Sequence, residues 1–158
     1  MAIEIERKFL VNGDSWKQEA DPPAYLRQAY LTRDHDCSIR VRTDGQRAWM
    51  NIKGATVGVQ RAEYEYEIPL ADGIELVERF ARGPVIEKWR YVIPAGRHHW
   101  EIDVFEGENS GLVVAEIELD DPADEFARPD WLGEEVTHDV RYYNTQLSLH
   151  PYRQWRSA

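Results

Sequence analysis

The stretch that decides the fold is Ile3-Glu4-Ile5-Glu6-Arg7-Lys8-Phe9-Leu10-Val11. Its even positions 4, 6 and 8 are charged, whereas the odd positions 3, 5, 9 and 11 are apolar, with Arg7 as the exception. Successive side chains of a β-strand point to opposite faces, so this period of two predicts a strand with one charged and one apolar face.

The rest of the chain continues this alternation, with turns at hairpin spacing and few helices. Further strands are predicted at 25–31, 38–42, 46–53, 59–69, 85–93, 97–105 and 112–119. Turns are expected at Asp34-His35-Asp36 and at the hairpin signal Thr43-Asp44-Gly45. Helices are predicted at 14–20, at 72–82 with Ile74, Leu76, Val77 and Phe80 on its apolar side, near 122–127, and at 137–150 with Thr137 as N-cap. Because no repeat or linker divides the chain, residues 1–158 are expected to form a single α+β, mainly β, domain around an antiparallel barrel.

The charges are sorted by strand, which an ordinary solvated sheet face would not require. The charged faces are Glu4/Glu6/Lys8, Arg40/Arg42, Arg61/Glu63/Glu65/Glu67, Lys88/Arg90, Glu101/Asp103 and Glu116/Glu118. Neighbouring like charges repel unless an opposite charge lies between them. Paired acids therefore favour a divalent cation, and paired bases favour an anion.

A barrel with its charged face inward resolves this pattern. The apolar faces then lie outside under the helices, and the interior becomes a tunnel with an acidic zone and a basic zone. Oxygen-rich sites suit Mg²⁺ or Mn²⁺, which carboxylates commonly share with substrate phosphates. Arginine pairs suit bidentate phosphate recognition.

Bulk composition limits the partners and the compartment. The chain has 158 residues, a formal net charge of -10 and one cysteine, Cys37. The acidic balance argues against nucleic acid or an anionic membrane as partner. With no possible internal disulfide, no apolar signal segment and no run of about 18 apolar residues, we expect a cytoplasmic protein.

The order of these motifs resembles the CYTH superfamily, the triphosphate tunnel metalloenzymes, and is closest to bacterial inorganic triphosphatases. Glu4-Ile5-Glu6-Arg7-Lys8 matches the family's E-x-E-x-K signature. The other matching blocks are Ile39-Arg40-Val41-Arg42, Ile52-Lys53-Gly54, Glu63 to Ile68, Glu87 to Tyr91, Trp100 to Phe105, Ala115 to Leu119 and Glu135 to Asn144.

The resemblance implies an eight-stranded antiparallel tunnel that binds a small-molecule triphosphate. It implies Mg²⁺ or Mn²⁺ held by Glu4, Glu6, Glu116 and Glu118. It also implies that the triphosphate is gripped by Lys8, Arg40, Arg42, Lys53, Lys88 and Arg90. Metal-dependent hydrolysis of the terminal phosphoanhydride of tripolyphosphate is the expected activity, with Glu63, Asp103 and Lys88 as catalytic candidates. Either a second metal or a carboxylate such as Glu63 or Asp103 would activate the water.

Several alternatives stay open. A class IV adenylate cyclase would keep the fold but needs a purine pocket, and a non-catalytic polyphosphate-binding module would not need two acidic strands. Some of Glu63, Glu65 and Glu67 could only balance the tunnel arginines. The C-terminal helix, with the tail 152–156, could cover the barrel exterior or close one tunnel mouth, and a homodimer through an exposed barrel face is possible.

Overall fold

The computed structural model describes residues 3–34 and 36–155. His35 of the predicted turn and Arg156 of the predicted tail lie outside this part of the chain. The strands are β1 (Ile3–Val11), β2 (Ala24–Asp34), β3 (Cys37–Thr43), β4 (Ala48–Gly54), β5 (Gln60–Ile68), β6 (Ile86–Ala95), β7 (His98–Phe105), β8 (Val113–Glu118) and β9 (Leu132–Glu135). Two α-helices, α1 (Leu70–Phe80) and α2 (Asn144–Leu147), and four 3₁₀ turns, η1 (Ser15–Glu19), η2 (Gly107–Asn109), η3 (Val140–Tyr142) and η4 (Tyr152–Gln154), complete the described chain.

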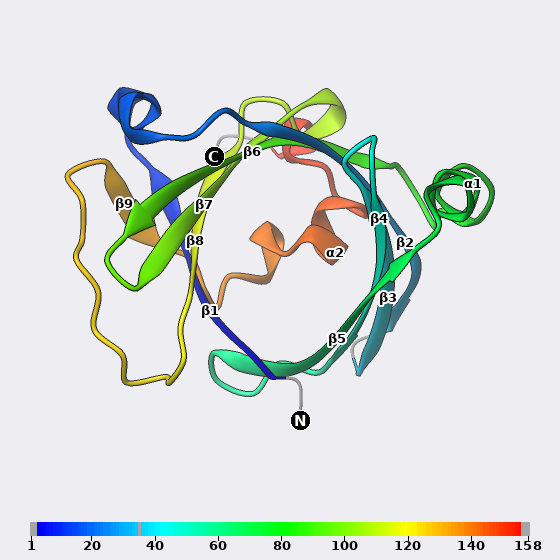
Figure 1. Cartoon of the computed structure of the whole chain (residues 1–158), viewed down its shortest axis with the longest axis horizontal. Helices are drawn as coiled ribbons and strands as arrows, with labels where there is room; N and C mark the ends of the chain where they lie inside the picture. The colour runs from blue at the N-terminus through cyan, green and yellow to red at the C-terminus, as the bar shows by residue number, and fades with distance from the viewer. Residues whose placement is uncertain (1–2, 35, 156–158) are drawn as a thin grey trace.

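The strands form a closed antiparallel ring (Figure 1). The sheet runs in the order β5-β4-β3-β2-β6-β7-β8-β1-β9, and β1 also pairs with β5. Closure uses the first residues of β1, with Ile3 opposite Ala62 and Ile5 opposite Gln60. Strands β1 to β8 thus make the predicted eight-stranded tunnel, and that prediction is confirmed.

The ninth strand was not predicted. β9 pairs with β1 at Phe9 and Val11, beyond the point where β5 has left β1. It has only four residues, Leu132–Glu135, and shows no alternation that separates two faces. It lies beside the ring and extends the edge of β1.

The apolar core lies outside the ring. Phe9, Trp100 and Ile117 are almost fully buried there, beneath the chain that carries Trp131. Trp16 anchors the short turn η1 against Tyr91, so the predicted helix at 14–20 is a 3₁₀ turn instead. The predicted helix near 122–127 is also wrong, because the chain there makes a turn and then runs without a helix.

Helix α1 packs on the outside of β2, β3 and β4. It begins and ends two residues before the predicted helix 72–82. Val77 is buried against Ala29 and Val41, as expected of an apolar helix face. Ile74 and Phe80, which were predicted to share that face, are exposed.

The C-terminal chain does not form the predicted helix 137–150. Thr137 is not an N-cap; its Oγ1 accepts a hydrogen bond from Lys8 N (3.0 Å) and donates one to Glu135 Oε2 (2.6 Å). These bonds hold the chain against β1, and only η3 and the short α2 are helical. Residues 137–147, here called the plug segment, place α2 within the outline of the ring (Figure 1). Two arrangements were expected for the C-terminal chain: covering the barrel exterior or closing a tunnel mouth. The plug segment enters the tunnel region and does not cover the barrel exterior.

No helix in 3–34 or 36–155 has the length and apolar character that crossing a membrane requires.

Candidate active site

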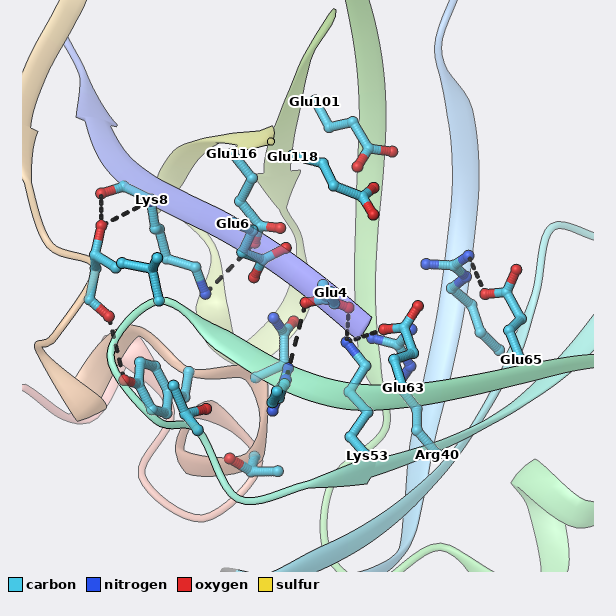
Figure 2. Close-up of a pocket in the computed structure, with 18 of the residues that line it drawn as sticks. Glu4, Glu6, Lys8, Arg40, Lys53, Glu63, Glu65, Glu101, Glu116 and Glu118 are labelled. Carbon is cyan, nitrogen blue, oxygen red and sulfur yellow. Dashed lines mark hydrogen bonds and ion pairs between the residues drawn. The ribbon is translucent and has the colours of Figure 1, made fainter. Parts of the chain in front are cut away.

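The ring encloses a cavity of about 250 Å³ with a strongly charged lining. Charged side chains reach it from β1 and from β3 to β8, because alternate residues of each strand point inward. They are Glu4, Glu6, Lys8, Arg40, Arg42, Lys53, Arg61, Glu63, Glu65, Lys88, Arg90, Glu101, Glu116 and Glu118. Figure 2 shows the carboxylates of β1 and β8 facing the same space as Lys53 and Arg40.

The two arginines of β3 carry charge that the protein hardly neutralises. Arg40 is buried, and no carboxylate of the described residues lies within 4 Å of it. Among the described carboxylates, Arg42 reaches only Glu65, at 3.7 Å. The Nε atoms of both arginines are buried without a hydrogen-bond acceptor within the described chain. Burial, together with the neighbouring Arg40 and Arg90, lowers the pKa of Arg42 to about 10. Unpaired buried donors of this kind are suited to an anion.

Lys88 and Arg90 share one buried carboxylate, that of Asp103. Lys88 Nζ donates to Asp103 Oδ2 at 2.8 Å, and Arg90 forms a bidentate pair with the same carboxylate at 2.8 and 3.0 Å. Burial opposes ionisation of Asp103, yet Arg90 and Lys88 hold its pKa below the usual range. Asp103 is 2% exposed and is not part of the cavity lining. It therefore holds two cations in position and does not face the cavity.

The remaining lysines each bind an acid on the tunnel wall. Lys53 Nζ lies 3.1 Å from Glu4 Oε2 and 2.9 Å from Glu63 Oε2. Lys8 Nζ lies 3.4 Å from Glu116 Oε1. Burial and a hydrogen bond with Glu4 raise the pKa of Glu63 to about 7. Despite burial, Lys53 and other neighbours keep the pKa of Glu4 low.

Glu6 and Glu118 form the opposite kind of site, an anionic pair without a cation. They lie directly opposite each other on β1 and β8. Over the described residues, no lysine or arginine comes within 4 Å of either carboxylate. Burial and the carboxylates of Glu116 and Glu4 raise the pKa of Glu6 well above its usual value. Burial and nearby Glu4 likewise raise the pKa of Glu118. A divalent cation would relieve this repulsion.

The sequence of the chain matches the CYTH domain over residues 2–147. The chain belongs to the CYTH family. A relative from Acetivibrio thermocellus named inorganic triphosphatase is 46% identical over 156 residues, which are 99% of each chain. Another inorganic triphosphatase, from Nitrosomonas europaea, is 40% identical over 152 residues, which are 92% of this chain and 97% of the relative. The crystal structure of the inorganic triphosphatase NE1496 superposes with a TM-score of 0.64 and is 37% identical, covering 94% of this chain and 96% of that chain.

Membership of the CYTH family implies a divalent metal, and the donor set of this chain fits one. Glu4, Glu6, Glu116 and Glu118 offer only oxygen atoms, which hard divalent cations prefer. In the part of the chain that the structure describes, no three acidic, histidine or cysteine side chains are gathered closely enough to hold an ion as they stand. Glu4 and Glu116 form ion pairs with lysines instead. The fit of this donor set to a divalent metal therefore rests on Glu6 and Glu118, which have no cationic partner among the described residues.

The CYTH tunnel brings together most of the charged residues singled out in the sequence. Several uncharged polar residues lie beside them. Glu67 stands apart, because its side chain is exposed near the end of β5 and pairs with Arg47 at 3.1 Å. Sequence patterns did not indicate Gln28, Asn51 or Asn144, which are uncharged and do not contribute to the sorting of charge. Gln28 and Asn51 are fully buried, and Asn144 lines the cavity from the plug segment.

Proposed function

We propose that this chain hydrolyses the terminal phosphoanhydride of inorganic tripolyphosphate, using Mg²⁺ or Mn²⁺. The observation that carries the proposal is the coexistence, in one cavity, of uncompensated positive and uncompensated negative charge. Among the described residues, Arg40 lacks a close counter-anion and Arg42 reaches only Glu65, at 3.7 Å, whereas Glu6 and Glu118 lack a counter-cation. A metal-bound polyphosphate supplies both. The names of the two relatives support the same activity.

The cationic side chains bind and orient the substrate. Arg40 and Arg42 bind phosphate oxygens with donors that have no other strong partner. Lys88 and Arg90 add charge from β6, held in place by Asp103. Lys8 and Lys53 complete the set of phosphate-binding cations. Preorganised positive charge of this kind stabilises the charge that develops on the transferring phosphoryl group.

Four carboxylates would hold the metal: Glu4, Glu6, Glu116 and Glu118. A bound divalent cation supplies Lewis-acid neutralisation of phosphate charge and favours ionisation of bound water.

Glu63 is the better of the two candidates for the group that accepts the proton of the attacking water. The Glu63 side chain lines the cavity and is 23% exposed, whereas the Asp103 carboxylate is buried and paired with Lys88 and Arg90. The water oxygen forms a bond to the terminal phosphorus while the bridging P–O bond breaks. Glu63 takes the proton, orthophosphate is released and pyrophosphate leaves. We therefore assign water activation to Glu63 and a positioning role to Asp103.

The test is phosphate release from tripolyphosphate, ATP, thiamine triphosphate and pyrophosphate in parallel, each with Mg²⁺, Mn²⁺ or EDTA. We expect metal-dependent release that is fastest with tripolyphosphate and absent in EDTA. Conversion of ATP to cyclic AMP and pyrophosphate would instead identify a cyclase. Binding of tripolyphosphate with no turnover under any condition would leave a polyphosphate-binding module.

Two broader expectations belong with this proposal. The lone Cys37 is exposed and unpaired, which supports a reducing compartment, and we propose the cytoplasm. A homodimer remains a prediction of the sequence.

A further inference from the structure

The plug segment contributes one polar side chain that contacts the tunnel's most deeply buried cation. Asn144, the first residue of α2, lines the cavity. Its Oδ1 accepts hydrogen bonds from Gln28 Nε2 at 3.0 Å and from Lys88 Nζ at 3.3 Å. Gln28 and Lys88 are both fully buried. Asn144 therefore connects the plug segment to β2 and β6 inside the ring.

Lys88 determines which way the Asn144 amide points. An ammonium group can only donate hydrogen bonds, so Asn144 has to turn its oxygen toward Lys88. Gln28 then has to present its own NH₂ group to the same oxygen, which leaves Gln28 Oε1 buried and without a partner in the described chain. The amide of Asn144 is planar, so its NH₂ group lies on the side away from Lys88 and Gln28.

The Asn144 NH₂ group has no acceptor among the described residues. The hydrogen bonds of the Asn144 side chain all go to Oδ1. The amide nitrogen is not among the buried polar atoms that lack a partner, as Gln28 Oε1 is, and Asn144 lines the cavity. Two fixed N–H donors are thus available next to the cationic wall formed by Lys88.

The plug segment holds a second cation in the same region. Lys8 Nζ donates to the carbonyl oxygen of Tyr142 at 3.1 Å and lies over the ring of Tyr143, 5.6 Å from its centroid. Residues 142–144 thus touch both Lys8 and Lys88. Asn144, Lys8 and Lys88 all line the same cavity, so a phosphate bound there lies near all three.

We propose that Asn144 is a further ligand of the triphosphate, donating from Nδ2 to a phosphate oxygen while its Oδ1 holds Lys88 in place. This inference rests on the proposed function, because it adds a donor to the same site. It gives the plug segment a direct part in substrate binding, in addition to its place in the tunnel region. A neutral amide suits this position, because it donates to phosphate without adding another positive charge beside Lys8 and Lys88.

Asn144→Asp and Asn144→Ala distinguish a ligand from a structural latch. Asp is nearly isosteric and keeps the oxygen that Lys88 and Gln28 need, but it replaces both N–H donors with a negative charge facing the phosphate. Ala removes the latch and the donors but adds no repulsion. A ligand role therefore predicts weaker binding in Asn144→Asp than in Asn144→Ala, whereas equal or tighter binding in Asn144→Asp would indicate that the amide only holds Lys88 in place.

The experiment measures tripolyphosphate binding by calorimetry in EDTA, and KM and kcat with Mg²⁺ or Mn²⁺. Loss of one hydrogen bond to a charged group predicts about a tenfold or greater rise in Kd and KM for Asn144→Ala, and about a hundredfold rise for Asn144→Asp. Gln146→Ala, in the same turn but outside the cavity lining, is the matched control and should bind like the wild type. Thermal unfolding checks that Asn144→Asp keeps the fold.

Binding by Asn144→Asp that equals or exceeds binding by Asn144→Ala would overturn the assignment. Wild-type protein that neither binds nor hydrolyses tripolyphosphate would instead refute the proposed function itself. The two failures are therefore distinguishable in one set of measurements.

Discussion

Lys88 Nζ lies 2.8 Å from Asp103 Oδ2, and the two side chains are 1% and 2% exposed. The pair forms on neighbouring strands β6 and β7, where Arg90 stands directly opposite Asp103 and binds the same carboxylate. One acid thus neutralises part of the charge of two buried cations. Both cations are held rigidly at the cavity wall by this arrangement, and Arg90 also pairs with Glu101 at 3.1 Å.

Asp103→Asn should destabilise the free protein more than the protein with bound substrate. Removing one member of a buried ion pair typically costs about 3–5 kcal/mol, because the partner charge stays buried without compensation. Bound tripolyphosphate would restore part of the missing negative charge. Thermal unfolding with and without tripolyphosphate checks this, and we expect a larger ligand-induced rise in midpoint for the variant. An equal rise in variant and wild type would contradict the positioning role.

Arg40→Gln should weaken substrate binding without weakening the fold. Arg40 has no ion-pair partner in the described chain and lies near the positive charges of Arg42 and Lys88. Its removal relieves repulsion, so the unfolding midpoint should stay the same or rise. KM for tripolyphosphate should rise about tenfold or more, as expected for lost charge-assisted hydrogen bonds. Arg47→Gln, at an exposed site paired with Glu67, is the control and should leave KM unchanged.

The period-two pattern predicted which side chains face inward, because a strand has only two faces. The charges of Glu4, Glu6 and Lys8 on β1 alternate with apolar residues, so they reach the cavity together. The pattern could not predict which of the inward-facing side chains of a strand reach the cavity. Glu101 and Asp103 share one face of β7, yet Glu101 lines the cavity and Asp103 lies behind Lys88 and Arg90.

Long-range contacts decided the parts that the sequence did not predict. Residues 137–150 were expected to be a helix, but the side chain of Thr137 bonds to Lys8 and draws the chain along β1. This contact joins residues 129 positions apart, so no local window contains it. Asn144 ends a block that matches the family, yet no role was predicted for it, since a neutral amide becomes informative only when Gln28 and Lys88 are beside it.

Glu6→Gln should abolish metal binding while preserving the fold. Glu6 faces Glu118 across the strand pair and has no cation within 4 Å among the described residues, so a neutral side chain removes repulsion. We expect an unchanged or higher unfolding midpoint at neutral pH, together with loss of measurable Mn²⁺ or Mg²⁺ binding by calorimetry. Glu75→Gln, on the exposed face of α1, provides the matched loss of one charge. Undiminished metal affinity in Glu6→Gln would exclude Glu6 as a ligand.

Substrate affinity should fall as the pH rises through about 8. Burial, with Arg90 and Arg40 nearby, lowers the pKa of Lys88 to about 8. Below this pH Lys88 is charged and attracts phosphate; above it, the attraction is progressively lost. KM for tripolyphosphate should therefore rise between pH 7 and 9.5 in the wild type. Lys88→Met removes the titrating group and separates this effect from titration of the substrate itself. If both proteins show the same pH dependence, Lys88 does not cause it.

Gly73→Ala should destabilise the fold although alanine favours helix more than glycine does. Gly73 is buried in the middle of α1, where an added Cβ would collide with the Cβ of Ala48 on β4. Helix propensity favours the change by about 1 kcal/mol, whereas overpacking of this kind typically costs about 1–3 kcal/mol. The cost of overpacking should exceed the gain in helix propensity, because the opposing atom belongs to a short side chain that cannot move away without its strand.

The double variant Gly73→Ala/Ala48→Gly tests that explanation directly. It moves the methyl group from β4 to α1, so the collision disappears while the volume at the contact is retained. We expect the free energy of unfolding, measured by denaturant titration, to recover relative to Gly73→Ala alone, with a coupling of about 1 kcal/mol or more between the two positions. Asp72→Ala, at the exposed neighbouring position, controls for changes in helix propensity. Simple additivity of the two substitutions would show that the close approach of α1 to β4 does not limit the choice of residue at position 73.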